Sequence, residues 1–103
     1  MNLVAISGRI CNDVKSHNTI VSFIVAVDRR YKAEGKPTTD FIRCVAFGKT
    51  SDYINKYFCK GMKIALTGRI QTGVYEKDGT KHYITEVIAE YVECAERKAD
   101  IEE

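Results

Sequence analysis

The stretch D-F-I-R-C-V-A-F-G-K, residues 40–49, has the composition of a β-strand with two unlike sides. Because successive side chains of a strand point to opposite faces, odd-numbered and even-numbered positions lie on different sides. One side holds Phe41, Arg43, Val45 and Phe47, and the other holds Ile42, Cys44 and Ala46. Both sides are largely apolar, but Arg43 has no obvious partner, and charged side chains are rarely buried unpaired. The question is therefore what the face with two rings and a guanidinium contacts.

Length and composition describe an ordinary globular domain. The chain has 103 residues, of which 45% are hydrophobic and 29% charged, enough for one domain with one core. No apolar run is long enough for a membrane span, and the start of the chain does not resemble a secretory signal, so we expect a cytoplasmic protein. The four cysteines lack C-x-x-C spacing, which predicts reduced thiols and neither a metal site nor a cofactor.

Charge is distributed unevenly along the chain. The net charge is +2, and the last nine residues are acidic while residues 1–94 are basic. We therefore expect a folded domain over residues 1–94 and a short, disordered acidic tail over residues 95–103. The mild basic excess of the domain permits a polyanionic partner without requiring one.

Turn signals divide the chain into five predicted strands. Glu34-Gly35 with Pro37, and Asp78-Gly79, mark two hairpin connections. The strands are expected at Leu3–Ile10, Thr19–Asp28, Thr39–Gly48, Lys63–Tyr75 and His82–Glu93.

One helix is predicted between the third and fourth of these strands. Thr50 or Ser51 would cap its start, Asp52 would suit the positive end of its dipole, and Gly61 would end it in the left-handed conformation. Four side chains recur at helical spacing and are expected to pack against the barrel: Tyr53, Ile54, Tyr57 and Phe58.

Three strands, a helix and two strands predict an all-β OB-fold, a five-stranded Greek-key barrel with one helix between strands three and four. A short internal repeat supports a barrel: S-G-R-I at residues 7–10 recurs as T-G-R-I at residues 67–70. Glycine inside a strand commonly marks the sharp bends that a small barrel needs.

In such a barrel the outer face of residues 41–47 resembles a platform for nucleobases. The rings of Phe41 and Phe47 would stack on bases while Arg43 and Lys49 hold phosphates. Aromatic residues also lie among cations in both predicted hairpins. The first hairpin offers Arg29, Arg30, Tyr31, Lys32 and Lys36, and the second offers Tyr75, Lys77, Lys81, His82 and Tyr83.

Several ordered blocks resemble the bacterial single-stranded DNA-binding protein family. They are S-G-R-I, F-I-V-A-V-D-R, D-F-I-R-C-V-A-F-G-K, Y-I-N-K-Y-F-C-K-G, T-G-R-I-Q-T and T-E-V-I-A-E, within residues 2–94. The resemblance implies an OB-fold and sequence-independent binding of single-stranded DNA during replication, recombination and repair. It further implies a homotetramer, with a homodimer as the alternative.

The resemblance also assigns roles to individual residues. Stacking aromatics fall on Phe41, Phe47, Tyr75 and Tyr31, although family members often have tryptophan at such places and this chain has none. DNA-contacting cations fall on Lys49 and Lys60, and candidate subunit contacts fall on Ile42 and on Leu3 and Ala5 of the first strand. The family's long linker and acidic tip ending in Pro-Phe do not match A-D-I-E-E, so recruitment of replication or repair proteins stays undecided. A truncated, mobile-element or specialised short form would all fit this ending.

Two other classes of function stay open at this stage. A metal-dependent hydrolase on the same fold would need its carboxylates, among them Asp28, Asp40, Asp78, Glu86 and Glu90, to converge, and no nucleophile or ligand set accompanies them. We therefore expect no enzymatic activity. A short primosome-type accessory subunit or protein-docking module with weak DNA binding is the main alternative, and nothing in the sequence distinguishes DNA from RNA.

Overall fold

A computed structural model describes residues 1–31 and 33–95 of the chain. Its elements are β1 (Val4–Ile10), β2 (Lys15–His17), β3 (Ile20–Asp28), β4 (Thr39–Phe47), α1 (Gly48–Tyr57), β5 (Lys63–Lys77) and β6 (Thr80–Cys94). Of the acidic tail predicted at 95–103, residues 96–103 lie outside the described residues. Within the described ranges no helix has the length and apolar character needed to cross a membrane.

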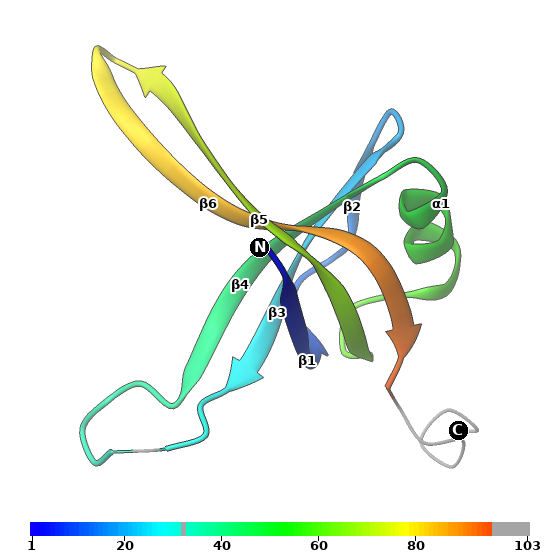
Figure 1. Ribbon diagram of the computed structural model, residues 1–103, viewed down its shortest axis with the longest axis horizontal. Helices are drawn as coiled ribbons and strands as arrows, with labels where there is room; N and C mark the ends of the chain where they lie inside the picture. Colours follow the sequence, from blue (N-terminus) through cyan, green and yellow to red (C-terminus); the bar gives the residue numbers. More distant parts are fainter. Residues whose placement is uncertain (32, 96–103) are drawn as a thin grey trace.

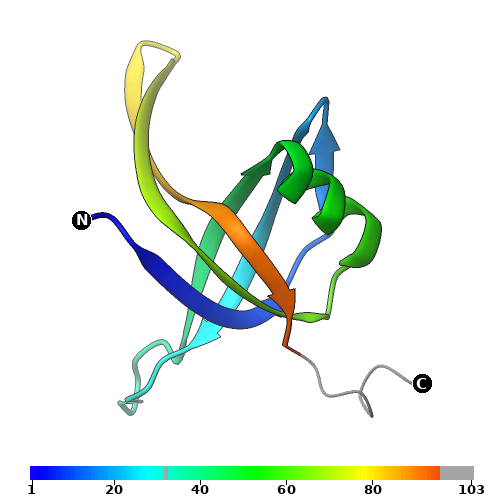
Figure 2. The same cartoon turned by 45° about the vertical axis from the view of Figure 1, so that its right-hand side comes forward.

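The five long strands close into a barrel, as predicted. Their order is β1-β5-β6-β4-β3, and a short antiparallel pairing of Arg9 and Ile10 with Ala26 and Val25 joins β3 back to β1. The β4–β6 pairing is parallel and all the others are antiparallel. Figures 1 and 2 show α1 against one end of the barrel, while the β3–β4 loop and the β5–β6 hairpin project away from it.

Alternation along the strands fills the barrel interior. Val21, Phe23 and Val25 of β3 are at most 1% exposed. Cys44 and Ala46 of β4 join the same core, as expected for the even-numbered side of that strand. Burial raises the pKa of the Cys44 thiol to about 12, so this thiol stays protonated and acts as a small apolar side chain.

Gly8 and Gly68, the two glycines of the short internal repeat, lie where strands cross closely. A Cβ atom on Gly8 would overlap the carbonyl oxygen of Ala26, and one on Gly68 would overlap that of Ile88. The β5–β6 register also shifts between Thr67 and Gly68, which bends the sheet there. The register shift confirms the predicted bend at Gly68, and at both glycines the close approach of a neighbouring strand explains why a side chain is absent.

The helix begins earlier than predicted. Its first residue is Gly48, its N-cap is Phe47 without a side-chain hydrogen bond, and its first turn has no acidic residue. The predicted caps Thr50 and Ser51 and the dipole role of Asp52 are therefore wrong; Ser51 is instead buried.

The end and the packing face of the helix also differ from the prediction. The C-cap is Phe58 in extended conformation, and Gly61, with φ of 96°, is left-handed but lies in the turn that leads to β5. Ile54 and Phe58 enter the core, whereas Tyr53 and Tyr57 are exposed and pack on one another with ring centroids 5.1 Å apart.

A sixth strand, β2, was not predicted. Its three residues are all exposed and pair with β3 through a turn at Asn18, which has φ of 58°. Because K-S-H has no apolar side to bury, the hydrophobic pattern gives no signal for this edge strand.

Candidate nucleic-acid interface

The two phenylalanine rings of β4 lie on the outside of the barrel, as predicted. Phe41 is 68% exposed and Phe47 is 45% exposed. Between them Val45 is 7% exposed and lies opposite Ile88 of β6, which is 3% exposed. The outer face of β4 therefore has exposed rings at its two ends and a closed apolar centre.

Arg43 has a partner that the sequence did not reveal. Its Nε donates to Oε2 of Glu86 on β6 at 3.1 Å. Glu86 is the more buried member, since its side chain is 18% exposed against 55% for Arg43. The carboxylate thus holds the guanidinium on the same face as Phe41, next to a groove of about 310 Å³ that Phe41, Arg43, Ile70 and Glu86 help to line.

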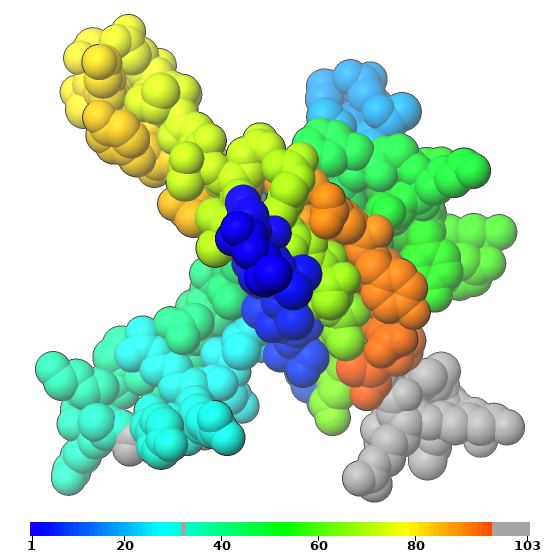
Figure 3. All heavy atoms as spheres, viewed as in Figure 1, coloured from blue at the N-terminus to red at the C-terminus, as the bar shows by residue number. Residues whose placement is uncertain are grey.

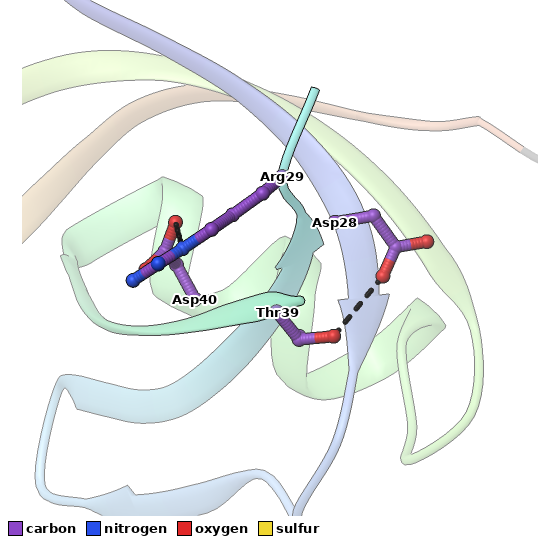
Figure 4. Close-up of polar contacts among 4 residues, drawn as sticks. All are labelled: Asp28, Arg29, Thr39 and Asp40. Atoms are coloured by element: carbon purple, nitrogen blue, oxygen red, sulfur yellow. Dashed lines mark hydrogen bonds and ion pairs between the residues drawn. The ribbon is translucent and has the colours of Figure 1, made fainter. Parts of the chain in front are cut away.

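The base of the β3–β4 loop is fixed by a second ion pair. Nε and Nη2 of Arg29 both donate to the carboxylate of Asp40, at 2.8–3.2 Å, and the hydroxyl of Thr39 donates to Asp28 (Figure 4). The hydrogen bond from Arg29 holds the pKa of the Asp40 carboxyl below its usual value, so the pair is fully ionised at neutral pH. A phosphate that binds Arg29 must compete with this carboxylate.

The remainder of the β3–β4 loop carries freely exposed side chains. Tyr31 is 84% exposed, and Arg30 and Lys36 are also exposed. Lys32, a predicted binding residue, lies outside the described residues. In Figure 3 this loop and the β5–β6 hairpin stand out from the body of the molecule as two separate arms.

The β5–β6 hairpin presents two different faces. Its two-residue turn at Asp78-Gly79, both with positive φ, pairs Lys77 with Thr80 and Tyr75 with His82. Because strand residues alternate, Tyr75, Lys77 and His82 share one face with Glu86, and Lys81 and Tyr83 lie on the opposite one. The five side chains that the sequence grouped together are therefore divided between the faces, three and two.

Lys49 and Lys60 lie at different places around the barrel. Lys49 is exposed in the first turn of α1, two residues after Phe47, and lines a groove of about 380 Å³ with Tyr53 and Tyr91. Lys60 is in the turn after α1, next to Gly61, whose N–H donates to Ile10. The neighbouring Gly61 carbonyl accepts a hydrogen bond from Arg9, and Arg9 lines a groove together with Phe41 and Lys63.

The predicted subunit contacts do not form one surface. Ala5 lines an apolar depression of about 330 Å³ with Ala65, Thr67 and Tyr91 on the outer side of β1, β5 and β6. Leu3, two residues before Ala5, is 68% exposed. Ile42, in contrast, is partly buried against the core and lines the separate groove beside Phe41.

The sequence did not assign Asp40 and Glu86 to the nucleic-acid site, and it did not predict the ring contact of His82, which it had only grouped with the second hairpin. The first two hold arginines by the ion pairs above, and the His82 ring stacks on Tyr75. Of these three contacts, only that of His82 could have been predicted from the sequence. A two-residue turn at Asp78-Gly79 fixes the hairpin register and pairs residue 75 with residue 82.

These features define an OB-fold with exposed rings and cations on the outside of the barrel and on two projecting hairpins. The sequence model of the "Single-strand binding protein family" matches residues 1–95. The chain is 43% identical to a single-stranded DNA-binding protein of Fusobacterium nucleatum, over 95% of this chain and 69% of the relative. It is 42% identical to single-stranded DNA-binding protein 3 of Clostridium acetobutylicum, over 93% of this chain and 72% of the relative. It therefore belongs to the single-strand binding protein family.

Proposed function

We propose that this chain binds single-stranded DNA without sequence preference, by stacking bases on Phe41, Phe47 and Tyr75. The observation that carries the proposal is the pair of exposed phenylalanine rings on the outer face of a closed barrel. A stacked base contributes roughly 1–3 kcal/mol whatever its identity, because every base has a π-face. Membership of the family and the names of the relatives support the same ligand.

Cations beside these rings would hold the phosphates. Arg43, Lys49, Lys77, Arg30 and Lys36 are exposed in the described part of the chain. Each phosphate neutralised on a single strand lowers the slope of log K against log salt concentration by about 0.7. Arg29 contributes less in this scheme, since Asp40 already occupies its guanidinium.

The proposed role is to coat and protect single strands in the cytoplasm during replication, recombination and repair, without catalysis. Three of the five carboxylates considered for an enzyme contact arginines: Asp40 and Glu86 bind Arg29 and Arg43, and Glu90 lies 3.6 Å from Arg69. In residues 1–31 and 33–95 no three His, Cys, Asp or Glu side chains converge to hold a metal ion.

Self-association through β1 is part of the proposal. The depression beside Ala5 and the exposed Leu3 would be covered by a second copy, as a dimer or a dimer of dimers. Several barrels in one assembly would bind one strand with higher avidity. Sedimentation would report the assembly, and a Leu3→Asp variant would shift it toward the monomer.

The proposal is tested by titrating a fluorescent dT oligomer, its duplex form and an RNA oligomer with the protein in the presence of Mg²⁺. We expect tight binding of the single strand, weak binding of the duplex and an intact oligomer at the end. Degradation of the oligomer would indicate a nuclease. Equal, weak binding of all three would favour the docking module.

Replacing Glu86 by glutamine tests the role of the Arg43 ion pair. Removal of the carboxylate frees the guanidinium for phosphate, so we expect about two- to fivefold tighter binding, the size of one exposed ion pair. The salt dependence should steepen by about 0.7 in slope. Asp52→Asn is the matched control, because it also neutralises one carboxylate, and Asp52 is exposed on α1. Weaker binding by Glu86→Gln would mean that Glu86 is needed to position Arg43.

A further inference from the structure

His82 and Tyr75 form a ring pair near the tip of the β5–β6 hairpin. The two rings are stacked, with centroids 5.1 Å apart and planes 18° apart, and both side chains are exposed. The imidazole covers one side of the tyrosine ring. A base that stacks on Tyr75 must therefore use the other face of the tyrosine ring. The nucleic-acid strand that carries this base must pass close to His82.

The charged groups around His82 favour an anion on this face of the hairpin. Lys77 follows Tyr75 by two residues and shares the face, while the neighbours of His82 on the same side of β6, Thr80 and Ile84, are neutral. Glu76 and Lys81 are paired across the opposite face, where their charges offset one another. Glu86, the next charged residue on this side of β6, is already bound by Arg43.

We propose that His82 is a further nucleic-acid contact whose protonated imidazole binds a phosphate of the strand that stacks on Tyr75. The inference rests on the proposed function and adds a pH dependence to it. Imidazoles change charge between about pH 5 and pH 8. Because the phosphate favours the charged form, binding takes up a proton, and the affinity for single-stranded DNA rises as the pH falls through this range.

The experiment measures the affinity for a dT oligomer at about pH 8 and about pH 6 over a range of salt concentrations. For the unaltered protein we expect about two- to fivefold tighter binding at the lower pH, the size of one exposed ion pair. The salt slope should steepen by about 0.7, as for one more neutralised phosphate. His82→Gln should lose both changes. His82→Phe should keep the ring pair and the affinity at the higher pH, and also lose both changes.

The chain supplies its own control, since it contains only two histidines. The other one, His17, lies in the edge strand β2 and is not part of the hairpin. His17→Gln should respond to pH like the unaltered protein. A response that persists in both His82 variants, or an unaltered protein without any response, would overturn the inference. Tight binding at the higher pH that still depends on Phe41 would leave the proposed function standing in either case.

Discussion

Alanine at both Phe41 and Phe47 is expected to weaken binding of a dT oligomer at least about 30-fold. Two stacked bases contribute roughly 2–6 kcal/mol together, and every 1.4 kcal/mol is a tenfold change in affinity. Because the cations are untouched, the slope of log K against log salt should stay the same. A fluorescence titration over several salt concentrations measures both quantities.

Tyr57→Ala is the matched control for this variant. Tyr57 is 55% exposed, which is similar to Phe47 at 45%, but it lies on α1 beside Tyr53 and away from the hairpins. Its loss should leave the affinity within about twofold, because surface substitutions outside the interface usually change energies by less than about 0.5 kcal/mol. Equal losses for the helix variant and the phenylalanine variant would remove the reason for placing the bases on β4.

Alanine at Gly68 is expected to lower the free energy of unfolding by about 3 kcal/mol or more. The added methyl group would overlap the carbonyl oxygen of Ile88, so β5 and β6 would have to separate where the sheet bends. For a domain of this size such a loss lowers the melting temperature by more than about 10 °C. Urea unfolding at one fixed protein concentration measures it, because self-association contributes to the apparent stability.

Gly73 provides the control on the same strand. A Cβ there would meet only the Ile84 side chain, at 3.3 Å, which can move slightly. Gly73→Ala should therefore change the free energy of unfolding by less than about 1 kcal/mol. If Gly68→Ala lowers the free energy of unfolding no more than Gly73→Ala does, the fold does not require the close strand crossing at Gly68.

Local patterns in the sequence predicted most of the barrel. Alternation placed Cys44 inside and Phe41 outside, and the Asp78-Gly79 turn located the second hairpin. The patterns failed where the structure relies on backbone bonding without a hydrophobic signal. The exposed strand β2 is one such case, and the start of α1 at Gly48 without a side-chain cap is another.

The rings of the candidate site were predictable, but the partners of its arginines were not. Arg43 and Glu86 are 43 residues apart and meet only because β4 pairs in parallel with β6. The separation of Ile42 from Ala5 likewise depends on how the strands close into a barrel. Such contacts depend on long-range strand pairing, which cannot be predicted from the hydrophobic periodicity of the sequence.

Ultraviolet cross-linking of the protein to a dT oligomer, followed by mass spectrometry of the linked peptides, tests the central claim most directly. Bases that lie flat on the outer rings should cross-link to Phe41, Phe47 and Tyr75. Cross-links confined to Tyr53, Tyr57 and Tyr91, which are also exposed, would contradict the account.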